Sequence, residues 1–296
     1  MTNTPSTPAF DSVDAVSDAL QGTGYLPSEE ISTTVYLAAA LGRPVLVEGP
    51  AGVGKTALAS AVAGATGRRL VRLQCYEGVD EARALYEWNH AKQLLRITAE
   101  QDAQWDELRT DIFGEEFLLA RPLLTAVRSD EPVVLLVDEI DKADEEMEGL
   151  LLELLSEFQI TIPELGTLRA RHRPLVVLTS NATRELSEAL RRRCLFLHID
   201  YPSPALEQRI VQAHVPELPD ALAASVVRVV GALRELQLRK SPSVAETVDW
   251  AGTLLSLGAA QLDPETVRRT LGVVLKHTGD IEIAHRKLDL DRALAG

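Results

Sequence analysis

The chain has 296 residues, which corresponds to about two domains of ordinary size. Apolar residues make up 46% of it and charged residues 25%, a composition that excludes a disordered or fibrous protein and favours a globular one. The formal net charge is -14. Because duplex DNA is bound mainly by neutralising its phosphates with Lys and Arg, this balance argues against a dedicated nucleic-acid binder.

The first 21 residues predict a polar, proline-punctuated tail followed by a short helix at 11–20. This start lacks the basic region and apolar core of a signal peptide, and no apolar run approaches the roughly 20 residues that cross a bilayer. The two cysteines, Cys75 and Cys194, form no disulfide framework or zinc-ligand cluster and suit a reducing interior. We therefore expect a soluble, cytoplasmic protein with no membrane partner.

Short apolar runs alternate with helical patterns over the next part of the chain. A turn at 22–27 and a helix at 29–41 precede the first run. The runs predict strands at 45–47, 69–74, 133–137, 175–178 and 194–199. Continuous apolar strands separated by helices indicate a parallel sheet that is covered by helices on both faces. The fold class is therefore α/β, with a parallel five-stranded sheet.

The pattern changes after Pro204. From about Leu206 to the end, apolar residues recur at helical spacing and no convincing strand is present. The sequence therefore predicts an α/β domain over 22–200 and a smaller, all-helical domain over 201–296.

Residues 49–56 match the phosphate-loop pattern G-x-x-x-x-G-K-[ST] and lie between a predicted strand and a predicted helix at 57–65. Its backbone amides and the following helix N-terminus can hold phosphate, Lys55 can reach the β/γ oxygens, and the Thr56 hydroxyl can bind Mg²⁺. The alternative is a glycine-rich turn with a stray lysine. The predicted nucleotide-binding residues are Gly49, Pro50, Ala51, Gly52, Val53, Gly54, Lys55, Thr56 and Ala57.

Two carboxylates, Asp138 and Glu139, follow the third predicted strand. At this end of a parallel strand Asp138 can hold Mg²⁺ near the phosphates, and Glu139 can orient or deprotonate the attacking water. An acidic pair after a strand can instead begin a helix. The glutamates of the following helix, Glu145, Glu146 and Glu148, predict a solvated face.

Asn181 ends the fourth strand region, where its amide can hold the attacking water or contact the γ-phosphate, or can simply cap the next helix at 184–190. Three arginines at 191–193 follow that helix. They either compensate its dipole or supply an arginine finger to a neighbouring subunit. We favour the finger, and Arg193 over Arg192, because Arg193 adjoins the fifth strand.

This order of motifs resembles the AAA+ ATPases over roughly 22–288. Residues 158–170 are similar to a pre-sensor-1 hairpin, and residues at about 75–95 are similar to an insertion into helix 2. The two features together resemble the MoxR-type ATPases. The stretches 138–144, 187–194 and 242–250 are similar to the CoxD-like branch.

The resemblance implies ATP and Mg²⁺ as cofactors, and a homo-oligomeric ring, a hexamer in the family. It also implies a partner with a von Willebrand factor A domain and a client metalloenzyme, such as a molybdenum hydroxylase or carbon monoxide dehydrogenase. No base-reading motif separates ATP from GTP. One departure concerns sensor 2, where Ser241-Pro242 is followed by Ser243 and not by arginine.

Two other functions compete with a chaperone-like ATPase. A motor that translocates on nucleic acid is disfavoured by the acidic balance. A scaffold that assembles on nucleotide without hydrolysis is suggested by the missing arginine at 243, but opposed by Lys55, Asp138 and Glu139.

Overall fold

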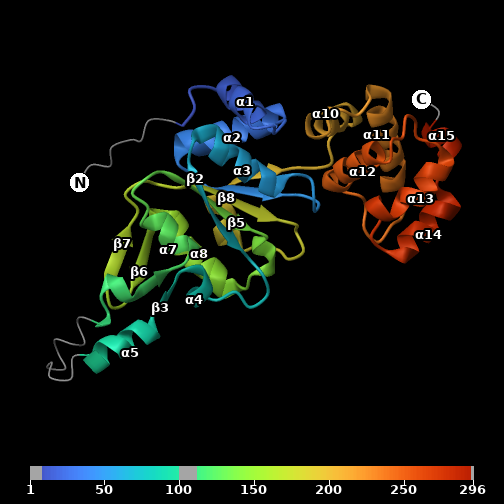
Figure 1. The fold of residues 1–296 in the computed structure, drawn as a ribbon. Helices are drawn as coiled ribbons and strands as arrows, with labels where there is room; N and C mark the ends of the chain where they lie inside the picture. The colour runs from blue at the N-terminus through green and yellow to red at the C-terminus, as the bar shows by residue number, and fades with distance from the viewer. Residues whose placement is uncertain (1–8, 100–111, 295–296) are drawn as a thin grey trace. The chain divides into compact units, whose positions relative to one another are not determined.

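The computed structural model describes residues 9–99 and 112–294 (Figure 1). Contacts divide the chain into two compact units. The α/β unit contains the described residues up to 23, together with 27–48 and 56–198. The helical unit contains residues 199–294 together with the short segments 24–26 and 49–55.

The α/β unit is built on a five-stranded parallel sheet with the order β2-β5-β8-β1-β9. All residues of β1 and β5 are buried, as expected of apolar strands in the middle of a covered sheet. The predicted five-stranded parallel sheet is therefore confirmed. Its strands are β1 (Val45–Glu48), β2 (Arg69–Gln74), β5 (Val133–Asp138), β8 (Leu175–Ser180) and β9 (Leu195–His198).

Helices cover both faces of this sheet, with α2 and α3 on one face and α7 and α8 on the other (Figure 1). The helix α9 starts at Glu188, later than the predicted 184, because the Ser187 side chain caps it by accepting from the amide of Leu190. The four helices on the sheet are α2 (Glu29–Leu41), α3 (Lys55–Thr66), α7 (Pro122–Val127) and α8 (Glu145–Glu157). In the same unit, α1 (Val13–Gly22) packs on α2, and α9 (Glu188–Arg193) contacts α8 and β9.

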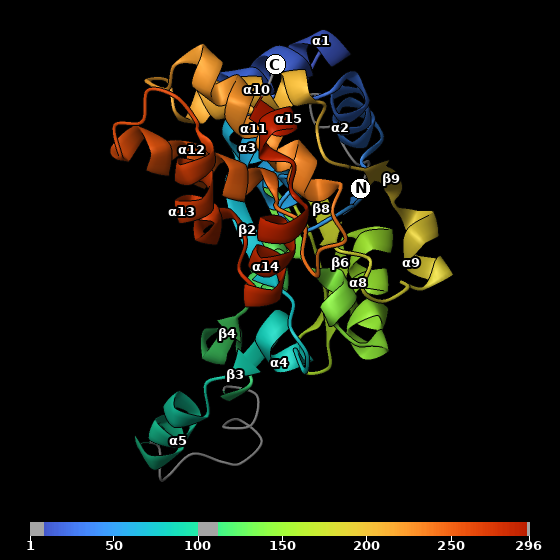
Figure 2. The same ribbon diagram turned by 90° about the vertical axis from the view of Figure 1, so that its right-hand side faces the viewer.

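Two small antiparallel sheets accompany the main one. Strands β6 (Gln159–Ile162) and β7 (Gly166–Arg169) form a hairpin in the segment where the sequence predicts one. The region of the predicted insertion holds α4 (Glu81–Ala84), β3 (Tyr86–Trp88) and α5 (His90–Ala99). Strand β3 pairs with β4 (Leu118–Ala120), and α5 lies beyond this pair, away from the five-stranded sheet (Figure 1, Figure 2).

The helical unit packs around Trp250, which is fully buried and donates its indole N–H to the Thr270 hydroxyl at 2.8 Å. A buried ion pair joins Arg234 to both carboxylate oxygens of Glu207, at 2.6 and 2.8 Å. The helices of this unit are α10 (Pro204–His214), α11 (Asp220–Arg234), α12 (Val244–Ser256), α13 (Pro264–Val274), α14 (Thr278–Lys287) and α15 (Leu290–Leu294).

The described residues of the whole chain include no helix with the length and apolar character of a membrane span.

Candidate active site

The phosphate loop connects β1 to α3, as its sequence pattern predicts. The ammonium of Lys55 is buried and donates to the carbonyls of Gly49 and Pro50, each at 2.6 Å. Gly52 has a φ of 77°, and a β-carbon there would lie 2.3 Å from the β-carbon of Ser243. Only glycine fits this conformation and this space, so the loop backbone keeps a tight path.

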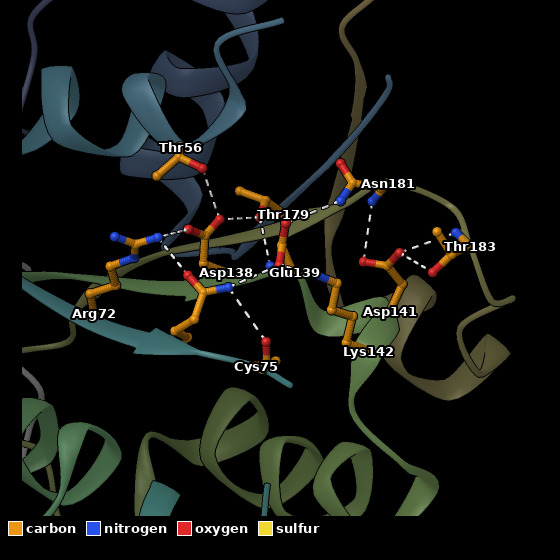
Figure 3. Close-up of polar contacts among 11 residues, drawn as sticks. Thr56, Arg72, Cys75, Asp138, Glu139, Asp141, Lys142, Thr179, Asn181 and Thr183 are labelled. Atoms are coloured by element: carbon orange, nitrogen blue, oxygen red, sulfur yellow. Dashed lines mark hydrogen bonds and ion pairs between the residues drawn. The ribbon is translucent and has the colours of Figure 1, made fainter. Parts of the chain in front are cut away.

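Asp138 ends β5 and is almost completely buried. One oxygen accepts from the hydroxyl of Thr56 at 2.9 Å and from that of Thr179 at 2.5 Å, and the other accepts from Arg72 at 2.5 Å (Figure 3). Thr56 lies in the first turn of α3, directly after the loop lysine. The hydroxyl and the carboxylate predicted to hold Mg²⁺ are thus in direct contact, and hard oxygen ligands of this kind suit that ion.

Glu139 follows Asp138 in a left-handed conformation, with a φ of 57°. Its amide donates to the Thr179 hydroxyl at 2.9 Å. Its carboxylate accepts from Gln74 at 3.0 Å. It also accepts from Lys142 at 2.5 Å (Figure 3). The hydrogen bond to this carboxylate is the main cause of the raised pKa of Lys142. The turn therefore separates the two carboxylates, and Glu139 remains about one-third exposed.

Asn181 follows β8 and donates its side-chain amide to Glu139 at 3.4 Å. The structure thus brings together Asn181 and Glu139, which the sequence predicts to act on the same water. Asp141 lies on the other side of Asn181 and accepts from its backbone amide at 3.2 Å. Burial raises the pKa of Asp141, but hydrogen bonds from Thr183 and Asn181 outweigh this effect and leave the pKa below its ordinary value.

The three arginines of α9 have different surroundings. Arg191 pairs with Glu48, the residue before the phosphate loop, at 2.7 Å. Arg193 donates to the Ser156 hydroxyl at 2.8 Å and so is held within its own chain. Arg192 has a side chain that is 80% exposed. The structure therefore places both predicted finger residues on the surface of the α/β unit, where Arg192 pairs with Glu188 at 3.5 Å.

The sequence analysis does not predict the residues that surround the two carboxylates. Arg72 and Gln74 reach β5 because β2 is its hydrogen-bonded neighbour, with Gln74 opposite Asp138. The strand order that creates this contact is not visible in a local motif. A weak signal existed for Thr179, because polar residues at the end of a buried strand often face a site. The missed residues are Arg72, Gln74, Asp141, Lys142 and Thr179.

The prediction that all three glutamates at the start of α8 are solvated is wrong for Glu148. Glu145 and Glu146 are exposed, but Glu148 is buried. It accepts from the backbone amide of Ser187 at 2.9 Å and pairs with Arg184 at 2.6 Å. A buried carboxylate needs such partners, and these are 36 or more positions further along the chain, beyond any helical pattern.

Comparison with known proteins identifies the family to which the chain belongs. The family model of the ATPases associated with various cellular activities (AAA) matches residues 45–201, more than half of the chain. The chain therefore belongs to the AAA family and is an ATP hydrolase that binds nucleotide. The predicted membership of the MoxR type of AAA+ ATPase is confirmed, whereas the CoxD-like branch stays a prediction.

Two curated relatives span most of the chain. The denitrification regulatory protein NirQ of Stutzerimonas stutzeri is 26% identical over 260 residues, which cover 80% of this chain and 86% of NirQ. Protein NorQ of Paracoccus denitrificans is 26% identical over 220 residues, which cover 72% of this chain and 73% of NorQ. Among solved structures, a variant of RuvB from Thermotoga maritima has a TM-score of 0.50 at 18% identity, covering 83% of this chain and 68% of RuvB, and supports the fold alone.

Proposed function

We propose that the chain is a Mg²⁺-dependent ATPase that works as a homo-oligomeric ring and remodels a client protein. Two contacts support the enzymatic part of the proposal. The Thr56 hydroxyl donates to Asp138, and the Asn181 side chain donates to the adjacent Glu139. Thr56 and Asp138 hold the ion, and the amides of the phosphate loop with Lys55 hold the phosphates. When bound, magnesium supplies positive charge that offsets the charge on the transferring phosphoryl group.

In this proposal Glu139 orients the attacking water and accepts its proton, and Asn181 fixes the carboxylate and the water relative to each other. Catalysis is then mostly positioning and electrostatic stabilisation. An arginine of α9, Arg193 or Arg192, neutralises transition-state charge in the site of a neighbouring subunit. Arginine fingers of this kind contribute roughly 10³–10⁵ in rate.

The biological part of the proposal is maturation of a metalloenzyme together with a protein that carries a von Willebrand factor A domain. It is supported by the resemblance of three sequence stretches to the CoxD-like branch and by the similarity to a denitrification regulatory protein. A ring that hydrolyses ATP can use the energy to remodel a bound client. Binding of a purified von Willebrand A protein in the presence of ATP tests this part.

The substitution Glu139→Gln tests the enzymatic part. It keeps the size of the side chain and its capacity to accept a hydrogen bond, but removes the base, so Mg-ATP should bind with nearly wild-type affinity while turnover falls by about 10²-fold or more. Full turnover in this variant would contradict the assigned role of Glu139. A wild-type chain that binds nucleotide and assembles but does not turn over would instead favour the scaffold.

A further inference from the structure

Two sharp turns lie side by side at the ends of the neighbouring strands β5 and β8. Each contains a non-glycine residue in the left-handed region, Glu139 with a φ of 57° and Ala182 with a φ of 55°. Such backbone is unfavourable for residues with a β-carbon and persists only where the surroundings hold it. The proposed function assigns Glu139 and Asn181 to the attacking water. Glu139 is itself one of the two strained residues, and Ala182 directly follows Asn181.

Side chains from each strand hold the backbone of the other turn. From β8, the Thr179 hydroxyl accepts from the amide of Glu139 at 2.9 Å. In return, Asp141, three residues beyond β5, holds the β8 turn through both of its carboxylate oxygens (Figure 3). The two turns are therefore cross-linked by polar contacts in both directions.

The contacts of Asp141 enclose the strained residue. One oxygen accepts from the amide of Asn181 at 3.2 Å. The other accepts from the amide of Thr183 at 3.1 Å and from its hydroxyl at 2.6 Å. The amide of Ala182 between them donates to the hydroxyl of Ser180 at 2.9 Å. Asp141 is only 3% exposed, so water competes little for these hydrogen bonds.

We propose that Asp141 is a positioning residue that sets the side chain of Asn181 against Glu139 by pinning the turn at Ala182. The inference rests on the proposed function, because it assigns Asp141 a role through that pair. In this proposal Asp141 acts on the turn and not on nucleotide, through the three hydrogen bonds that it accepts from Asn181 and Thr183. Its loss therefore affects the chemical step and leaves the binding of nucleotide to the phosphate loop intact.

The test compares Asp141→Asn with Asn181→Ala and with the double variant. Asparagine has one acceptor oxygen where aspartate has two, so it cannot accept from the backbone amides of both Asn181 and Thr183. We therefore expect kcat to fall about tenfold or more while Mg-ATP affinity stays within about twofold. Because Asp141 acts through Asn181, the double variant should be no slower than Asn181→Ala alone. Multiplied losses in the double variant, or weakened nucleotide binding with unchanged kcat, would overturn the proposal.

The matched control is Asp144→Asn. Asp144 caps α8 by accepting from the amide of Met147 at 2.9 Å, and asparagine caps as well as aspartate, so kcat should not change. If Asp141→Asn does not fold, Thr183→Val removes only the hydroxyl contact. It should lower kcat about fivefold, and this loss should vanish in the Asn181→Ala background.

Amide hydrogen exchange gives a readout that does not depend on turnover. The amides of Asn181 and Thr183 should exchange faster in Asp141→Asn than in the wild type. In Asp144→Asn their exchange rates should equal those of the wild type. Equal protection of both amides in Asp141→Asn and wild type would overturn the pinning of the turn. Absent wild-type turnover with altered exchange would instead contradict the proposed function and leave the role of Asp141 in the turn standing.

Discussion

The two carboxylates at the end of β5 are held by side chains from the strands on either side. Arg72 and Gln74 come from β2, and Thr179 comes from β8, because β5 lies between these strands. Hydrogen bonds of this kind fix a carboxylate's orientation before substrate arrives, which is the arrangement that electrostatic catalysis requires. The orientation of the two carboxylates thus depends on side chains of the neighbouring strands, which lie outside the local Asp-Glu motif.

The prediction at this scale concerns Gly52 of the phosphate loop. Alanine there would take an unfavourable left-handed φ and overlap Ser243, so the loop must move and present its amides differently. We expect Gly52→Ala to weaken Mg-ATP binding at least tenfold, measured by titration calorimetry. The strain from the left-handed residue alone is about 1 kcal/mol.

Gly149→Ala is the control for this prediction. Gly149 lies inside α8, and a β-carbon there meets no atom within 4 Å. Alanine should leave the affinity for nucleotide unchanged and stabilise the helix by about 0.5–1 kcal/mol. Nucleotide binding at wild-type strength by Gly52→Ala would show that the loop does not need its present path.

Much of the residue-level site was predictable, because a phosphate loop and a strand ending in two carboxylates place hard oxygen ligands at known positions. The exceptions depend on tertiary structure. Asp141 looks like an ordinary polar residue after the acidic pair, and its contacts with Asn181 and Thr183 lie 40 and 42 positions along the chain. Glu148 fits the pattern of a solvated helix face, but in the fold it is buried against Arg184 and Ser187, which precede α9.

At the scale of elements, the buried carboxylate of Glu148 joins α8 to the start of α9. It accepts from the amide of Ser187, the residue that caps α9, and it pairs with Arg184. The last turn of α9 carries the arginines proposed to reach a neighbouring subunit. The orientation of that helix therefore depends in part on one ionised side chain.

We predict that the free energy of unfolding depends on pH through the ionisation of Glu148. Burial raises the pKa of Glu148, but the contacts with Ser187 and Arg184 outweigh it, so the folded pKa lies below the unfolded value of about 4.3. The unfolded chain then binds more protons in this range, so this stabilisation is complete above the unfolded pKa and lost as pH falls through the folded pKa. Urea unfolding between pH 3 and 7 should show the loss of stability.

Glu148→Gln should flatten that pH dependence and lower the stability at neutral pH, because Arg184 loses its charged partner. Glu145→Gln is the matched control, since Glu145 is an exposed residue of the same helix. An unchanged pH profile in Glu148→Gln would contradict the role of this carboxylate.

The elements themselves were predicted where apolar runs are continuous and bounded by glycine or proline, as at β1 and β5. Boundaries failed where polar residues remain in a strand. Strand β8 continues through Thr179 and Ser180, which pair with Val47 and Glu48, although the apolar run ends at 178. Strand β4 has three residues, too few for a periodic signal, and forms only by pairing with the distant β3.

At the scale of the whole molecule, the proposal requires a second copy of the chain. Mixing Arg193→Ala subunits with Glu139→Gln subunits should restore part of the activity, because an intact arginine of one chain meets an intact glutamate of the other. The measurement is steady-state ATPase rate against mixing ratio. Recovery at no ratio would contradict a trans role of Arg193, and the same experiment with Arg192→Ala separates the two arginines.

The binding of Mg-ATP by the phosphate loop can be measured as equilibrium binding of ATP with and without Mg²⁺, for the wild type and for Lys55→Ala. We expect saturable binding by the wild type that Mg²⁺ strengthens, and loss of this binding in Lys55→Ala, because one ammonium group and the loop amides hold the phosphates. A wild-type chain with no affinity for Mg-ATP, or a Lys55→Ala chain that binds it equally well, would rule out nucleotide binding by this loop and its lysine.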